Sequence, residues 1–377
     1  MYISDPNELA SFCEMASKEQ VVAVDTEFLR ERTYYPRLCL IQLGTAGASA
    51  AIDPLAIRDL SPLVDLLTNR GIVKVFHACT QDLEVIQAAL GCVVAPVFDT
   101  QLAAAFLGQR QQLGYGALVE AYCGVRLPKA ESLTDWSRRP LDKEQLQYAE
   151  DDVRYLPGIY QTMTDALRRS RREGWLGPEM AQLTDPSRFT RSPDQAYLHL
   201  KRANSLTRRQ LSIARELCAW RERTAAQRDI PKKWVLSDEV VLEACKRAPR
   251  AAERLRRIRG AEQMGERDAQ EAIAAIRRGL DCEPALYPER LNHERPSGET
   301  EGVLDLMYAL LRIVAEKNGI AAQLIATKDD LLEFVTLRSA SRLARSAWRY
   351  ELVGRQLDGL LDGQIGLTVK DGRIELL

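Results

Sequence analysis

The stretch that decides the fold is VVAVDTEF, residues 21–28. Its apolar first half, rich in β-branched residues, predicts a short buried strand, and the two acids Asp25 and Glu27 stand where that strand ends. Two residues apart on an extended chain, their carboxylates point to the same face. Because like charges repel unless a cation joins them, the pair indicates a divalent metal, magnesium or manganese from the oxygen ligands. Taken alone, the pair fits more readily a strand that ends in solvated acids.

Similar short apolar runs follow on the C-terminal side of this strand. Runs at 38–43, 50–52 and 72–76 predict further buried strands, and helical patterns that end at glycine are present at 82–90 and 99–107. A further helix is predicted over 61–67. Strands that alternate with helices in this way are typical of an α/β domain, which we place at residues 1–170.

The pattern changes after this domain. Residues 171–204 are largely polar and broken by prolines, which predicts a linker. Residues 205–290 show helical spacing without convincing strands and predict a small helical bundle. Residues 291–377 predict a second helical unit that ends in a hairpin around an Asp-Gly turn.

The charge of the chain is distributed unevenly although the net charge is only −1. Residues 1–160 hold 14 Lys and Arg against 21 Asp and Glu, residues 161–290 hold 27 against 19, and residues 291–377 hold 11 against 13. An acidic first part beside a basic middle suits metal chemistry next to a module that holds a polyanion. Charged helical surfaces alone account for the same pattern.

Composition excludes several classes of protein. With 46% hydrophobic and 28% charged residues, the chain is neither disordered nor fibrous. We expect no membrane span and no secretion signal, since no apolar run is long enough. The eight cysteines lack a CxxC pair, which argues against a zinc finger and favours reduced thiols in a cytoplasmic protein.

Two further segments carry candidate site residues. Asp82 stands at the start of a predicted helix after the strand 72–76, where an acid also favours the helix dipole. In QLQYAEDDVRYL, residues 145–156, Tyr148 and Asp152 are four apart and so share one face of a helix. In isolation, the first segment fits a helix cap and the second a solvated acidic helix.

Together the three segments resemble the DEDD exonuclease superfamily, in the subgroup with a tyrosine in the third motif. The surrounding sequence is similar to bacterial ribonuclease D, and the stretches that carry this are residues 24–44, 76–86, 98–108 and 133–141. The stretches 217–244 and 255–260 resemble an HRDC domain, and the last 85 or so residues resemble a second, more divergent copy. The resemblance implies a ribonuclease H-like mixed sheet flanked by helices, followed by two small all-α bundles.

The resemblance also implies two-metal hydrolysis of phosphodiester bonds. Asp25 would bridge two divalent ions, Mg²⁺ or Mn²⁺, with Glu27 and Asp152 on the ion that holds the attacking water and Asp82 near the other. Tyr148 would orient the water through its hydroxyl, because a group with a pKa near ~10 is a poor base at neutral pH.

Substrate contacts are expected outside the carboxylate set. Phe28 follows Glu27 on the strand and, by resemblance, wedges near the 3′-terminal base, although an ordinary core role is as well supported. Further candidates for RNA contact lie in the loop before the third motif and in the first helical bundle: Trp136, Arg138, Arg139, Lys232 and Lys233.

These features predict a metal-dependent 3′–5′ exoribonuclease that matures the 3′ end of transfer RNA precursors and releases 5′-mononucleotides. The preference for RNA with a free 3′ end comes from the resemblance, because the site residues do not distinguish ribose from deoxyribose. Two alternatives stay open: a DNA exonuclease of the same superfamily, and a non-catalytic nucleic-acid-binding scaffold. The sequence identifies no protein partner.

Overall fold

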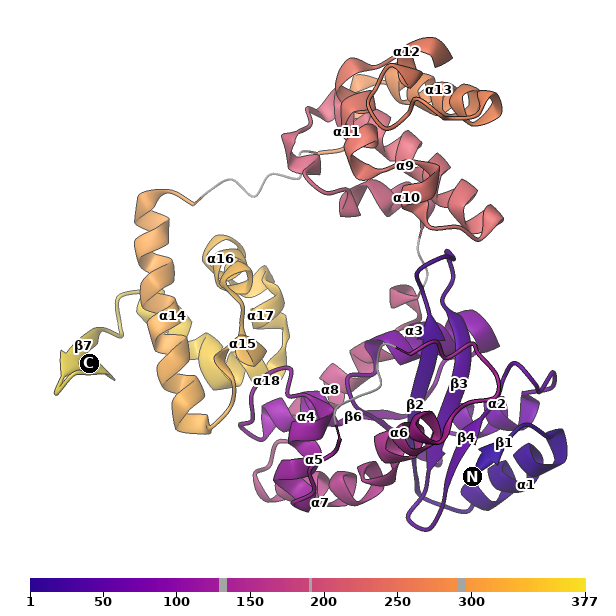
Figure 1. Cartoon of the computed structure of the whole chain (residues 1–377). Helices are drawn as coiled ribbons and strands as arrows, with labels where there is room; N and C mark the ends of the chain where they lie inside the picture. The colour runs from indigo at the N-terminus through magenta and orange to yellow at the C-terminus, as the bar shows by residue number, and fades with distance from the viewer. Residues whose placement is uncertain (129–133, 190–191, 290–295) are drawn as a thin grey trace. The chain divides into compact units, whose positions relative to one another are not determined.

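The structure is a computed structural model that describes residues 1–128, 134–189, 192–289 and 296–377. The chain divides into two compact units, and Figure 1 labels many of their elements. Unit 1 comprises Met1–Glu27, Cys39–Asp185 and Arg295–Leu377, and unit 2 comprises Phe28–Leu38 and Pro186–Glu294. The predicted boundary at 290–291 lies outside the described residues, and the predicted domain limits stay predictions.

Unit 1 is built on a mixed sheet with six strands in the order β1-β4-β3-β2-β5-β6 among the described residues. The strands are β1 (Tyr2–Ile3), β2 (Val21–Leu29), β3 (Arg37–Gly44), β4 (Ser49–Ile52), β5 (Val73–Phe76) and β6 (Val97–Asp99). The central strand β2 runs parallel to β5, β5 runs parallel to β6, and β3 runs antiparallel to β4. The strands predicted around residues 21, 38, 50 and 72 are all present.

Helices flank this sheet. They are α1 (Pro6–Ala16), α2 (Ser61–Thr68), α3 (Thr80–Leu90), α4 (Thr100–Phe106), α5 (Tyr115–Cys123), α6 (Lys143–Arg154), α7 (Leu156–Arg169) and α8 (Glu173–Leu183). Local sequence sets the start of α6, because Asp142 and Gln145 form a reciprocal capping box. Proline in the first turn of α7 has no amide hydrogen to leave unsatisfied there.

One face of the sheet is covered by α6 and α7. Val153, Leu156 and Ile159 of these helices share a hydrophobic cluster with Ala23 of β2 and Val75 of β5. Their burial removes apolar surface from water, which is the main force that holds the two helices on the sheet. This packing fixes α6 beside β2.

A helix occupies part of the segment predicted as a linker. Within 171–204 the structure contains α8 and three 3₁₀ turns, Pro186–Arg188, Pro193–His199 and Ala203–Ser205. Leu176 and Met180 of α8 are buried, and the Met180 sulfur accepts the amide hydrogen of Asp99 on β6. A four-residue apolar spacing therefore docks α8 on the sheet, although Pro178 lies within the helix.

The C-terminal part of unit 1 is helical and ends in a hairpin. Its elements are α14 (Gly298–Asn318), α15 (Ala322–Ile325), α16 (Lys328–Leu337), α17 (Arg342–Arg345), α18 (Ala347–Arg349), α19 (Arg355–Leu361), β7 (Leu367–Lys370) and β8 (Arg373–Leu376). Asp371 and Gly372 have φ values of 49° and 74°, as the predicted Asp-Gly hairpin turn requires. These helices share a hydrophobic cluster with α4, α7 and α8, which explains why they belong to the same unit.

Unit 2 is a helical bundle. Its helices are α9 (Arg208–Arg228), α10 (Lys232–Val235), α11 (Asp238–Arg247), α12 (Ala252–Arg256) and α13 (Glu266–Asp281). Helices α9 and α13 approach closely, since a Cβ on Gly279 would lie 2.5 Å from the Cα of Ile213. The segment Phe28–Leu38 is held on this bundle by Tyr34, whose hydroxyl donates to Glu222 at 2.8 Å.

The architecture confirms the predicted fold class, a mixed α/β sheet flanked by helices followed by helical parts. None of the helices within the described ranges combines the length and apolar character needed to cross a membrane.

The contact between β3 and α6 leads to a test of how α6 is held. A Cβ on Gly44 would lie 2.8 Å from the carbonyl oxygen of Val153, so Gly44→Ala forces α6 outward. We expect the free energy of unfolding to fall by about 1–3 kcal/mol, the usual cost of overpacking, as measured by urea denaturation. The control is Gly47→Ala, because a Cβ there meets nothing within 4 Å. Equal stability of the two variants would contradict the prediction.

Candidate active site

The carboxylates of Asp25, Glu27 and Asp152 meet beside the central strand β2, which continues past both of its acids to Leu29, further than the sequence predicted. One oxygen or more from each lies within 4.8 Å of the others, although Asp152 is more than a hundred residues further along the chain. Asp25 and Glu27 project from β2, and Asp152 projects from α6. The same-face spacing on the strand and the packing of α6 on the sheet together produce this cluster.

Tyr148 lies one turn before Asp152 on α6, so the two side chains lie on one face of the helix. The Tyr148 ring lies 5.9 Å from the ring of Trp136, centroid to centroid. Burial, followed by the charges of Asp152 and Glu27, raises the pKa of the Tyr148 hydroxyl above its ordinary value. The hydroxyl is therefore a neutral donor at physiological pH and not a base.

Asp82 lies in the first turn of α3 and is buried. Its Oδ1 accepts a hydrogen bond of 2.5 Å from the hydroxyl of Thr26, the residue between the two acids of β2. Its negative charge contributes to the raised pKa values of Asp25 and Glu27, so it acts on the same cluster. The structure thus brings all four predicted acids close enough to interact electrostatically. Asp82 binds Thr26 and is not one of the three acids whose oxygens lie within 4.8 Å of one another.

Burial raises the pKa of all four acids, and the charges of neighbouring acids of the cluster add to this effect for Asp25, Glu27 and Asp152. Burial and the charge of Asp152 raise the pKa of Glu27 to about 8. Burial raises the pKa of Asp152 to about 7 and that of Asp82 to about 6. Burial and the three neighbouring acids raise the pKa of Asp25 well above its usual range. These shifts require a positive charge if all four groups are to be ionised near neutral pH.

The cluster fits a divalent metal ion. Its donors are carboxylate oxygens, the ligand type that magnesium and manganese prefer. In addition, Oδ2 of Asp152 is buried and has no hydrogen-bond partner in the part of the chain that the structure describes. A buried acceptor without a partner is costly, and a cation in the cluster satisfies it.

Trp136 and Arg139, predicted to contact substrate, are engaged within the protein. Trp136 is only 2% exposed, which leaves its ring no free face for a base. Arg139 forms a bidentate ion pair with Asp53, with bonds of 2.6 and 2.8 Å, and donates to the carbonyl of Trp136 at 2.8 Å. Because Trp136 packs on Tyr148, these two residues support the tyrosine, and their burial does not favour RNA contact.

The other predicted substrate residues are more accessible. Arg138 is exposed, and Phe28, next to Glu27 on β2, is half-buried. In unit 2, Lys233 is exposed on α10 and is followed by Trp234, which is 58% exposed. Lys232 lies 3.9 Å from the buried carboxylate of Glu222.

Sequence reasoning missed two residues around the cluster. Tyr115 of α5 donates to the carbonyl of Asp151 at 2.7 Å, and the charges of Asp152 and Asp25 help to raise its pKa. Thr26 orients Asp82 through the hydrogen bond described above. For Thr26 the sequence offered no direct signal, because alternation along a strand places its side chain on the opposite face from the two acids. Nothing in the sequence placed Tyr115 near the third motif.

Acids drawn from three distant segments to one place beside a central strand, with a tyrosine one turn from the last of them, define a DEDD-type 3′–5′ exonuclease, a class that uses divalent metal. The family model of the 3′–5′ exonuclease matches residues 1–168, and the HRDC domain model matches residues 210–276. The chain belongs to the ribonuclease D family and is a hydrolase of the 3′–5′ exoribonuclease type.

Relatives and a solved structure agree with this assignment. Ribonuclease D of Sphingobium indicum is 39% identical over 99% of this chain and 97% of its own length. Ribonuclease D of Nitrobacter hamburgensis is 38% identical over 99% of this chain and 98% of its own length. The crystal structure of Escherichia coli RNase D matches with a TM-score of 0.86 at 32% identity, covering 96% of this chain and 98% of that one.

The raised pKa values predict how metal binding depends on pH. In the metal-free protein, Asp152 and Glu27 hold protons in the folded state up to about pH 7 and 8, whereas in the unfolded chain they lose them near their ordinary values. The folded state therefore binds more protons in this window, and stability falls as pH rises through it. Divalent metal displaces fewer protons at high pH and so binds more tightly there.

We therefore expect the melting temperature without metal to fall between pH 5 and pH 8, and the gain on adding Mg²⁺ or Mn²⁺ to be larger at pH 8 than at pH 6, as measured by calorimetry. Asp25→Asn should raise the metal-free melting temperature at pH 8 and reduce the metal-dependent gain, because it removes one repelling charge and one ligand. A gain on metal addition that does not depend on pH would contradict the assignment of these carboxylates as ligands.

Proposed function

We propose that the protein trims the 3′ ends of structured RNA, transfer RNA precursors among them, and releases 5′-mononucleotides with the help of two divalent cations, Mg²⁺ or Mn²⁺. The observation that carries the proposal is the convergence of Asp25, Glu27 and Asp152 within 4.8 Å, with Asp82 beside them. We place the activity in the cytoplasm, because six of the cysteines, among them the buried Cys13, Cys218 and Cys245, are free thiols.

Each acid has its own part in this proposal. Asp25, whose pKa all three of the other acids raise, is the natural shared ligand, and Glu27 and Asp152 complete the compact group. Asp82, held by Thr26, serves the second cation. When bound, the cations neutralise charge on the phosphodiester and lower the pKa of a water molecule. The carboxylates fix where this takes place, and their burial strengthens the electrostatic effect.

Tyr148 orients the attacking water in this proposal. Its hydroxyl is neutral at working pH and lies beside Asp152, so it donates or accepts a hydrogen bond without removing a proton. The packing of Trp136 on its ring, backed by the ion pair of Arg139 with Asp53, limits how far the hydroxyl moves. Fixing a nucleophile in this way lowers the entropic part of the barrier.

The RNA substrate follows from family membership and from accessible side chains. Escherichia coli RNase D is an exoribonuclease involved in structured RNA processing, and we extend this substrate class to the present chain. We assign Phe28 to the 3′-terminal base and Arg138 to the backbone, since neither is fully buried. On unit 2, Lys232, Lys233 and the exposed ring of Trp234 offer charge and a stacking surface for single-stranded RNA.

The direction of hydrolysis and the need for metal can be tested on one labelled RNA. With 5′-labelled RNA we expect a ladder that shortens with time, and with 3′-labelled RNA immediate release of a labelled mononucleotide, both abolished by EDTA. Asp25→Asn should lower the rate by about three orders of magnitude while RNA binding persists. Asp65→Asn, an exposed acid of α2, is the matched control.

Each failure of this test has a distinct meaning. Equal rates for wild type and Asp25→Asn in manganese would favour a non-catalytic scaffold. Faster degradation of a DNA oligomer than of the RNA oligomer of the same sequence would favour a DNA exonuclease.

The role of the tyrosine can be tested separately. Tyr148→Phe keeps the ring against Trp136 and removes only the hydroxyl, so we expect kcat to fall about 10²-fold at saturating metal with KM little changed. Tyr160→Phe on α7, which packs edge-on against Phe98, should leave turnover unchanged. If Tyr148→Phe turns over as fast as wild type, Tyr148 has no part in the mechanism.

A further inference from the structure

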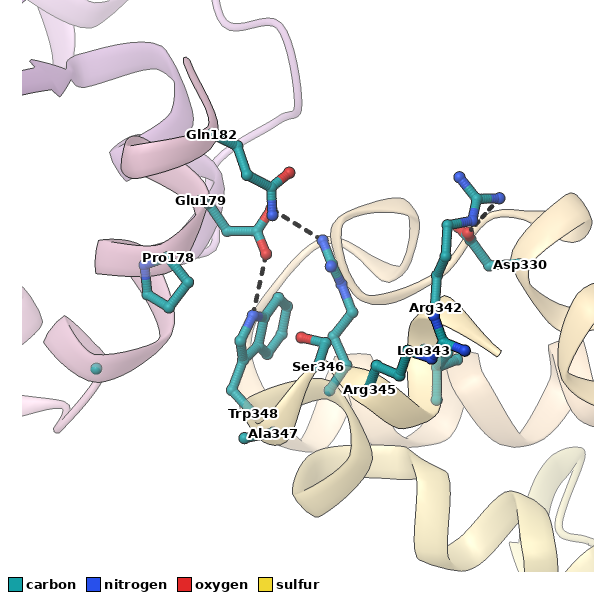
Figure 2. A pocket seen from close by; sticks show the side chains of 12 residues that line it. Pro178, Glu179, Gln182, Asp330, Arg342, Leu343, Arg345, Ser346, Ala347 and Trp348 are labelled. Atoms are coloured by element: carbon teal, nitrogen blue, oxygen red, sulfur yellow. Dashed lines mark hydrogen bonds and ion pairs between the residues drawn. The ribbon is translucent and has the colours of Figure 1, made fainter. Parts of the chain in front are cut away.

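A cavity of about 660 Å³ lies in unit 1 between α8 and the helical segments α17 and α18, and Figure 2 shows its walls. Its polar lining comes from both sides: Glu179, Gln182, Asp330, Arg342, Arg345, Ser346 and Arg349. None of these residues belongs to the carboxylate cluster described above. The cavity is therefore a separate feature of the same unit.

The wall formed by α17 and α18 belongs to a strongly basic segment. Residues 338–355 contain five arginines, no lysine and a single acid, Glu351. Arg342, Arg345 and Arg349 are spaced by three and four residues, the spacing that brings side chains to one face of a helical segment. All three line the cavity.

Two of the three arginines are neutralised by carboxylates. Arg349 pairs with Glu179 of α8 at 3.0 Å. The same carboxylate accepts the indole hydrogen of Trp348 at 3.1 Å (Figure 2). Arg342 pairs with Asp330 at 3.1 Å and with Glu333 at 2.7 Å. These contacts hold the wall in place. They also engage the three carboxylates of Glu179, Asp330 and Glu333 in ion pairs.

Arg345 is exposed and has no carboxylate within ion-pair distance among the described residues. It therefore gives the cavity an uncompensated positive charge with several free donors. The hydroxyl of Ser346 and the carboxamide of Gln182 line the same cavity. The two acids of the lining, Glu179 and Asp330, are paired with Arg349 and Arg342. The Arg345 guanidinium, with the neutral donors of Ser346 and Gln182 in the same lining, matches the oxygens of a phosphate better than it matches any cation or apolar group.

We propose that this cavity, named here the arginine pocket and defined by Gln182, Arg342, Arg345, Ser346 and Arg349, binds a backbone phosphate of the RNA substrate away from the scissile bond. The inference rests on the proposed function, because it takes RNA as the ligand. Arg345 is the contact residue, and the Glu179 ion pair positions the wall that carries it. The pocket then contributes to affinity for long, structured RNA.

The test measures RNA affinity over a range of salt concentrations. The full chain carries Asp25→Asn to prevent cleavage, and the probe is a hairpin RNA with an unpaired 3′ trailer. Adding Arg345→Gln should weaken binding and reduce the slope of log affinity against log salt by about 1, the loss of one phosphate contact. Arg345→Lys should keep the slope, because the charge remains, and recover part of the affinity. Arg355→Gln, an exposed arginine of the same segment outside the pocket, should change neither quantity.

Failure of the pocket and failure of the proposed function give different results. If the protein without Asp25→Asn does not shorten the hairpin RNA from its 3′ end, the proposed function falls. If it does, and Arg345→Gln leaves affinity and slope unchanged or lowers affinity without changing the slope, the arginine pocket does not bind phosphate. Unchanged RNA affinity together with Arg345-dependent binding of an acidic peptide would assign the pocket to a protein partner and overturn the proposal.

Discussion

The clustering of partly buried carboxylates, which desolvation and mutual repulsion both oppose, is the constraint on which the active site depends. Asp25, Glu27 and Asp152 lie with oxygens within 4.8 Å of one another, and Asp82 adds a fourth charge. Such a group costs folding free energy when it is ionised without a cation. A fold that retains it must hold it by packing elsewhere, and the site becomes stable in its ionised form only with divalent metal. The same four residues therefore set both the stability of the ionised protein and its metal-dependent chemistry.

The packing that holds the group together is concentrated around α6. Gly44 lets the backbone of α6 lie directly on β3, and the capping box of Asp142 and Gln145 fixes where the helix begins. Beneath Tyr148, the buried ring of Trp136 is anchored through Arg139 to Asp53. Because the acids push apart, the helix that carries Asp152 needs this apolar and hydrogen-bonded support on several sides.

Local sequence patterns predicted the strands β2 to β5 and several helices of the sheet domain, because each depends on periodicity within one element. The four acids were brought together as one site only by the resemblance of their three segments to a known family, since each segment alone fits an ordinary structural role. Local sequence patterns did not predict how Arg139 and Trp136 are used. A basic residue next to a tryptophan in a loop fits RNA contact equally well, and the partner Asp53 lies 86 residues away in the sequence. The same holds for α8. Pro178 led us to predict a linker there, and the helix is stabilised by the contact of its apolar side chains with β6, which the local sequence does not show. Long-range pairing, not local propensity, decided these residues.

The acidity that the site needs conflicts with binding a polyanion. The chain as a whole has a net charge of −1 and its first 160 residues are acidic, so its overall charge does not attract RNA. At physiological salt, charges further apart than roughly 8–10 Å are largely screened, and only basic groups close to the backbone of the RNA contribute. Positive charge must therefore be local and separated from the carboxylates. Basic residues outnumber acids in residues 161–290 and in the segment 338–355, so both offer local positive charge of this kind.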